Sequence, residues 1–388
     1  MHLAMACLRY ISFPSVWSED GSETSSREQG LGQIFRDYAS TYWYQHIKSN
    51  RRNDSDLTKM INKFFSVSNS TWEKWEKWFS IHEQLLMHNE KTESGSRIHY
   101  ACRLGLLETV RYLLLQQPEG VNSKTSSGKT GLLMACVQGH TDIADLLMSF
   151  EADIETCSIN GCTPLYFASM GNHISIVESL ICHGASTSIA DGRGRTPLLA
   201  ACIRGSKDVV AFLLASNADP TVPTNNGWTP LNVAATEGHT DIVRLLLEQT
   251  VDLHAPTIEG RTPIYNASLK GHKEIVHLLL EFGAQPQVGT NTGWTPLMAA
   301  SSTGHLAVTK YLLQHGADLS SCNNDGVQAL YLASRKGYEE IVQCLLEKGA
   351  DPNAVNDNGW TPIHTSAEFG HLQVTRLLKA HGADIHAR

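Results

Sequence analysis

The sequence lacks three features, each of which would place it in a different class of protein. It has no run of about 20 apolar residues, the length that a membrane-spanning helix needs. It has no surplus of basic side chains either. The net charge is −8, with 11 basic and 12 acidic residues up to position 95 and 20 and 27 after it. Without an apolar run of that length, we expect no membrane insertion. Because neutralising phosphates needs Lys and Arg in excess, we also expect no nucleic acid partner.

The third missing feature is an even set of cysteines. The nine cysteines are scattered, and an odd number cannot form a complete disulfide framework. This indicates a reducing compartment and a cytoplasmic protein, with nuclear entry left open. The apolar residues 1–17 have no basic n-region, and Arg9 interrupts them, so we interpret them as folded protein instead of a signal peptide.

What the sequence does contain is a 33-residue period that runs from Thr130 to Thr361 over seven intervals without a gap. Its marker is Thr-Pro followed by Leu or Ile. A Thr hydroxyl caps free backbone N–H groups, and Pro suits the first helical position. The six intact copies begin at Thr163, Thr196, Thr229, Thr262, Thr295 and Thr361, and degraded copies begin at Thr130 and Gln328. Each copy therefore predicts the start of a helix.

The rest of each period predicts a helix pair. A small residue lies five positions after the Thr and lets helices approach closely. Nine positions after the Thr, a Gly that is usually followed by His ends the first helix, as at Gly238-His239. A second amphipathic helix follows, for example over residues 242–247. This 33-residue sequence pattern resembles the ankyrin repeat. The resemblance implies an all-α solenoid of about nine repeats over residues 91–388, counting a first copy at Ser96, with a concave surface that binds proteins.

Residues 1–90 show no such period and contain five of the eight tryptophans. We expect an exposed loop over 18–30 and helices over 31–49 and 72–88. The second helix would place Trp72, Trp75, Phe79, His82 and Leu86 along one face. An aromatic stripe of this kind is typical of core packing. We predict that this helical region caps the first repeat.

Residues 3–13, 35–39 and 42–46 resemble a segment of fungal proteins of the NACHT class, which are signal-transducing NTPases. There the segment follows the nucleotide-binding and winged-helix parts and precedes an ankyrin array. The resemblance implies that this chain is the ligand-sensing C-terminal portion of such a receptor. Nothing before the segment can supply the Gly-rich phosphate loop of a NACHT NTPase, so we expect no nucleotide hydrolysis by this chain.

Two patterns could suggest chemistry. Residues 126–130 look like the end of a phosphate-binding loop, but Ser123 stands where the first Gly belongs, and Gly128 and Thr130 fall on the Gly-x-Thr of the repeat. Six histidines share one repeat position, too far apart to ligate one zinc ion, and are better explained by hydrogen bonds between adjacent loops. We expect no enzymatic activity, no cofactor and no metal site.

A protein or peptide partner would bind at the loop tips and the exposed face of the first helices. The tip position before each Thr reads Lys129, Cys162, Arg195, Trp228, Arg261, Trp294, Val327 and Trp360. Candidates on the first helices are Met170, Arg204, Glu237, Lys270, Arg335, Lys336 and Phe369. Trp and Arg are frequent interface hot spots. The alternative is that these Trp and Arg residues only pack on the preceding loop, and that they recur because a 66-residue unit was duplicated.

The final helix, expected over residues 372–381, keeps Val374, Leu377 and Leu378. This favours an array that continues in a longer chain, or an end that self-associates. We interpret the protein as an interaction scaffold and expect the NACHT-like sensor role. The alternatives are a free-standing ankyrin adaptor or inhibitor that tethers a partner enzyme, and a nucleotide-dependent enzyme that uses residues 128–130.

Overall fold

The computed structural model describes residues 2–12, 16, 39, 43, 55–66, 71–86 and 95–385. Apart from turns, 3₁₀ residues and one isolated bridge between Cys322 and Gln328, the regular structure of these residues is α-helical. The chain divides into two units, Met1–Ser186 and Thr187–Arg388. That division falls inside the repeats. The boundary expected near residue 90 stays a prediction.

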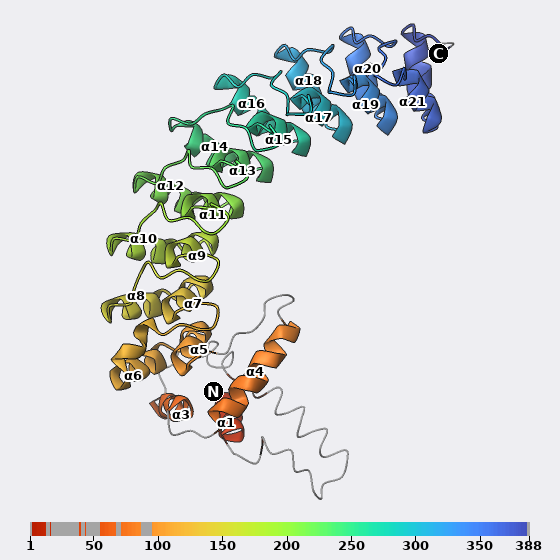
Figure 1. Ribbon diagram of the computed structural model, residues 1–388. Coiled ribbons are helices and arrows are strands. Elements are labelled where there is room, and N and C mark those ends of the chain that lie inside the picture. The colour runs from red at the N-terminus through yellow and green to blue at the C-terminus, as the bar shows by residue number, and fades with distance from the viewer. Residues whose placement is uncertain are drawn as a thin grey trace, which may run out of the picture. The chain divides into compact units, whose positions relative to one another are not determined.

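The unit Met1–Ser186 holds three leading helices and three helix pairs (Figure 1). The leading helices are α1 (His2–Ile11), α3 (Ser55–Phe65) and α4 (Trp72–Leu86). The pairs are α5 (Arg97–Leu104) with α6 (Leu107–Gln116), α7 (Gly131–Gln138) with α8 (Thr141–Ser149), and α9 (Pro164–Met170) with α10 (Ile174–Cys182). The 3₁₀ helix η2 (Pro118–Asn122) follows α6.

The unit Thr187–Arg388 holds six more pairs, stacked in chain order (Figure 1). They are α11 (Pro197–Arg204) with α12 (Lys207–Ala215), α13 (Pro230–Glu237) with α14 (Thr240–Leu247), α15 (Pro263–Lys270) with α16 (Lys273–Glu281), α17 (Pro296–Thr303) with α18 (Leu306–Gln314), α19 (Ala329–Lys336) with α20 (Glu339–Glu347), and α21 (Pro362–Glu368) with α22 (Leu372–Ala380). The nine pairs confirm the predicted all-α repeat fold.

The first helices begin and end where the sequence pattern of the repeat predicts. The Thr196 hydroxyl accepts a hydrogen bond from the backbone N–H of Leu199 at 3.3 Å, and Pro197 takes the first helical position. At the other end, Gly238 closes α13 in the left-handed conformation, with φ 81°. Asn172, the expected substitute for Gly, has φ 59°. Most first helices, which have seven or eight residues, are thus fixed at both ends by local sequence.

The core lies between successive pairs. In Thr187–Arg388, the first helices pack on one another in order from α11 to α21, and the second helices from α12 to α22 do the same. The small residue five positions after each Thr is completely buried, as at Ala201, Ala234, Ala267, Ala300 and Ala333. Because one pair cannot bury its own apolar face, each repeat depends on its neighbours.

The shared histidines lie between consecutive repeats, as their position predicted. The Nε2 atoms of His140, His272 and His371 lie 3.2, 3.1 and 3.0 Å from backbone carbonyls of the preceding repeat, those of Arg103, Thr236 and Arg335. Each ring also packs on the Gly that ends the preceding first helix. The histidines are therefore structural connectors between loops.

Two of the leading helices, α3 and α4, contact the first repeat. Trp72, Trp75 and Phe79 of α4 are buried, and their ring centroids lie 5.6, 5.6 and 6.0 Å from that of Tyr100 in α5. In addition, α3 packs on α6. The sequences of α1 and α3 do not follow the 33-residue pattern, and these two helices were not predicted.

Part of the leading region lies outside the described residues. The loop expected over 18–30 lies there, as do the side chains of His82 and Leu86. Of the helix expected over 31–49, only Ala39 and Trp43 are described, and both are helical and buried.

Candidate protein-binding surface

The tip residues are held by a closed turn in every repeat of Thr187–Arg388. The backbone N–H of Trp228 donates to the Thr224 hydroxyl at 3.1 Å, and Trp294 does the same to Thr290 at 3.1 Å. In return, the N–H groups of these two threonines donate to the tip carbonyls at 2.9 Å. The backbone under each tip side chain is therefore fixed before any partner arrives, which lowers the entropic cost of binding.

A ladder of backbone hydrogen bonds joins neighbouring tips. The N–H of Ile258 donates to the carbonyl of Asn226 at 3.0 Å, and that of Asn291 donates to the carbonyl of Glu259 at 3.2 Å. The Asn291 amide adds a bond to the Ile258 carbonyl at 2.8 Å. The corresponding bonds of the other tips begin at Asn225, Asn324 and Asp357. We call the tip positions and the last turns of the first helices in this unit the candidate surface.

The structure distinguishes between tip residues that share one sequence position. Cys162 and Val327 are buried, so they offer little to a partner. Trp228 and Trp294 are half-buried, and Trp360 is exposed beside His364, with ring centroids 5.9 Å apart. The three tryptophans thus combine a packed face with an accessible edge, as interface anchors do.

Arg195 and Arg261 share this position but differ in environment. Both Nε and Nη2 of Arg195 contact one carboxylate oxygen of buried Asp191, at 2.8 and 2.6 Å. Burial alone would raise the pKa of Asp191, but hydrogen bonds from Arg195 and from the backbone of Arg193 outweigh it and lower that pKa. Arg195 is therefore largely committed to its own loop.

Arg261 is paired much more loosely. Its Nε lies 2.7 Å from Oε2 of Glu259, a side chain that is 66% exposed, and its guanidinium carbon lies 6.0 Å from the centroid of the Tyr265 ring. It borders an open groove of about 630 Å³, whose lining includes Trp294, Leu269 and Ser302. Two predicted tip residues, Arg261 and Trp294, thus meet at one groove.

The predicted first-helix residues lie at the helix ends. Arg204, Glu237, Lys270, Arg335, Lys336 and Phe369 are exposed, and Met170, in the other unit, is half-buried. The Arg335 guanidinium lies 5.4 Å from the centroid of the Phe369 ring, so these two residues form one cation–π contact across repeats. Sequence reasoning missed Tyr265 and Leu269 as groove residues. Their signal was available: they lie three and seven positions after Thr262.

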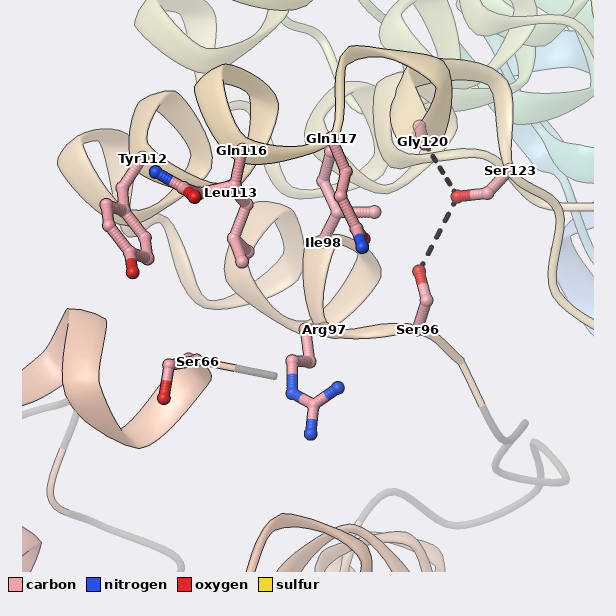
Figure 2. A pocket seen from close by; sticks show the side chains of 10 residues that line it. All are labelled: Ser66, Ser96, Arg97, Ile98, Tyr112, Leu113, Gln116, Gln117, Gly120 and Ser123. Atoms are coloured by element: carbon pink, nitrogen blue, oxygen red, sulfur yellow. Dashed lines mark hydrogen bonds between the residues drawn. The ribbon is translucent and has the colours of Figure 1, made fainter. Parts of the chain in front are cut away.

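A second cavity, of about 490 Å³, lies in Met1–Ser186 among the end of α3, the start of α5, α6 and η2 (Figure 2). The Ser123 hydroxyl bridges the Ser96 hydroxyl and the Gly120 carbonyl on one side of it. Arg97 lies 5.3 Å from the centroid of the Trp72 ring. Burial lowers the pKa of Arg97, although Glu73 and Glu76 oppose that shift. None of the residues predicted to bind a partner lines this cavity.

The patterns that could suggest chemistry have local roles. Gly128 lies in the loop turn with φ 76°, and the Thr130 hydroxyl caps α7 by accepting from the N–H of Leu133 at 3.3 Å. Within the described part of the chain, no group of three His, Cys, Asp or Glu side chains could hold a metal ion. No helix there has the length and apolar character that crossing a bilayer requires.

Comparison with known proteins agrees with this geometry. The family model for ankyrin repeats, which spans three copies, matches residues 98–191, 186–257, 250–323 and 317–388. These stretches together cover most of the chain, so the protein belongs to the ankyrin repeat family. Ankyrin repeats are binding modules for other proteins and are generally without catalytic activity. No curated protein matches the chain significantly.

Proposed function

We propose that this protein is a non-catalytic scaffold that binds a protein or peptide through the candidate surface of Thr187–Arg388. The observation that carries the proposal is the fixed presentation of large side chains: Trp228, Trp294 and Trp360 recur every second repeat on closed, hydrogen-bonded turns. A rigid array of aromatic anchors favours recognition without a conformational change. The mechanism needs no cofactor.

Affinity capture with the full chain tests the proposal. We expect a partner that binds the wild-type chain and is lost from a variant carrying Trp228→Ala, Trp294→Ala and Trp360→Ala. Phe282→Ala is the matched control, since Phe282 is a 52% exposed aromatic residue at the end of the second helix α16. Equal capture by the triple variant, with circular dichroism showing an intact fold, would rule out this surface as the binding site.

We further propose that the scaffold is the ligand-sensing portion of a fungal NACHT-like NTPase. The support is the resemblance of residues 3–13, 35–39 and 42–46. The helix α1 falls in the first of these segments and buries Ala4, Cys7, Leu8 and Ile11. The alternative is a free-standing adaptor or inhibitor that tethers a partner enzyme. Sequencing the native transcript separates them: an upstream Gly-x-x-x-x-Gly-Lys-Ser/Thr loop in the same frame favours the receptor, and a start codon at Met1 favours the adaptor.

Two smaller proposals concern the location of the protein and its self-association. All nine cysteines are free thiols, which supports a reducing, cytoplasmic location. Self-association through the last repeat also remains a proposal, supported by the exposure of Phe369 and Leu372.

A further inference from the structure

We infer that the groove at Arg261 and Trp294 recognises a partner segment in which a carboxylate side chain lies next to a bulky apolar side chain. This inference rests on the proposed function and specifies the partner's chemistry at one place on the candidate surface. The groove lies between the loop that precedes Thr295 and the first helix α15. Its volume of about 630 Å³ suits a few side chains of an extended segment.

Two hydrogen-bond donors remain available at this groove. Arg261 contacts Glu259 most closely through Nε, and the five N–H donors of a guanidinium leave others for a second acceptor. Tyr265 is 6% exposed, and its hydroxyl makes no hydrogen bond to any described residue. Burial raises the pKa of Tyr265, so the hydroxyl keeps its proton and stays a donor. Both residues line the open groove, so an acceptor supplied by a ligand can take the place of water on these donors.

The acceptor is best supplied as a carboxylate. Guanidinium groups bind carboxylates through charge-assisted hydrogen bonds, which are stronger than neutral ones. Glu259 shows that a carboxylate fits against this guanidinium. Because Glu259 is 66% exposed, its own pair contributes little to stability, and a partner carboxylate can join or replace it without a large loss. Arg195 cannot act in this way, since the buried Asp191 carboxylate already holds it.

The charge at the tip positions and last turns agrees with an acidic partner. The chain is acidic, with a net charge of −8, yet basic side chains outnumber acidic ones at these positions, and the tip turns add the acidic Glu259, Asp325 and Asp357. Its tip and last-turn positions carry Arg195, Arg204, Arg261, Lys270, Arg335 and Lys336 against the acidic Glu237 and Glu368. Opposite charge favours the encounter and excludes basic competitors. Next to the donors, Trp294 and Leu269 line the groove with apolar surface, and this part selects the neighbouring bulky side chain.

The test selects random dodecapeptides on phage against the full chain and measures the winning peptides by fluorescence polarisation. We expect enrichment of Asp or Glu next to Phe, Trp, Leu or Ile. Arg261→Gln should weaken a selected peptide by about tenfold or more, as should Glu→Gln in that peptide, and the two changes together should cost no more than either alone. Tyr265→Phe, which removes one hydroxyl, should weaken binding several-fold. Arg244→Gln on α14 is the matched control and should change nothing.

The outcomes separate this inference from the proposed function. If the selected peptides lose affinity with Trp228→Ala or Trp360→Ala but not with Arg261→Gln and Trp294→Ala, the surface binds partners elsewhere and the groove inference fails alone. Peptides without acidic enrichment also overturn it. If peptides are selected but no variant on the candidate surface weakens them, or if none is selected, both proposals fail.

Discussion

At the scale of single residues, two separate constraints fix the Gly at the end of most first helices. Gly238 has φ 81°, which disfavours any side chain, and a Cβ there would meet Cε1 of His272 at 2.7 Å. Gly316, after α18, has a similar φ of 80° but open space around it. These two glycines therefore separate backbone strain from steric conflict between repeats.

We predict that Gly316→Ala lowers the free energy of unfolding by about 1–2 kcal/mol, the cost of a left-handed residue with a side chain. Gly238→Ala should cost about 1–3 kcal/mol more, because the His272 ring must move as well. Urea denaturation of both variants measures the difference. Equal losses would show that the histidine ring yields without cost, contrary to its role as a connector.

A second residue-scale prediction concerns the Asp191–Arg195 pair. Asp191→Asn should reduce the free energy of unfolding by about 1–3 kcal/mol, since it removes charged hydrogen bonds inside a buried turn. Asp241→Asn, in the exposed pair with Lys207, should cost less than about 1 kcal/mol.

The effect of Asp191 should depend on pH in one direction. Its pKa is lower in the folded chain than the ordinary value of 3.8, so its contribution is complete above that value and is lost as the pH falls through the folded pKa. Urea denaturation of wild type and Asp191→Asn across pH 2 to 7 should show the difference shrinking only at the acid end. A difference that grows toward low pH would contradict this assignment.

At the scale of elements, the leading helix α4 packs on the first repeat, and we predict that it stabilises this repeat. Trp75 of α4 is completely buried, stacks on Phe79 at 4.9 Å between ring centroids, and lies 5.6 Å from Tyr100 of α5. We predict that Trp75→Ala costs about 3–5 kcal/mol and increases hydrogen exchange in α5 as well as α4. Trp360→Ala, at an exposed site, is the control. Faster exchange confined to α4 would contradict a capping role.

The repeat elements could be predicted from sequence because each boundary carries its own chemical mark, Thr-Pro at the start and Gly at the stop. The helices α1 and α3 have no such marks. The packing of α3 (Ser55–Phe65) depends on burying Phe64 and Phe65 against Trp43 and Trp72. Contacts of that kind join distant parts of the chain. A single sequence does not reveal them.

The candidate surface was predictable as a set of positions, but not residue by residue. Arg195 and Arg261 look equivalent in the sequence, yet one is bound to Asp191 and the other borders a groove. The residue four positions earlier, Asp191 or Thr257, is the local signal that separates them. The groove itself needs side chains from two repeats. Its existence follows from stacking and not from either repeat alone.

At the scale of the whole molecule, the tip positions and last turns of the candidate surface differ in charge from the second helices. Basic side chains outnumber acidic ones on the candidate surface, whereas the second helices carry both signs, for example Asp208, Glu274 and Glu340 beside Lys207, Lys273 and Lys310. An excess of one sign at the candidate surface favours encounter with a partner of opposite charge. Because surface charges are screened by salt, partner binding should weaken as ionic strength rises.

The most direct test of the central claim is hydrogen–deuterium exchange of the full chain with and without its captured partner. We expect slower exchange in the tips at residues 224–228, 257–261, 290–294 and 356–360 and in the last turns of the first helices. Exchange in α12, α14 and α16 should stay unchanged. Protection of those second helices with unchanged tips would contradict the claim that this ankyrin protein binds through its candidate surface.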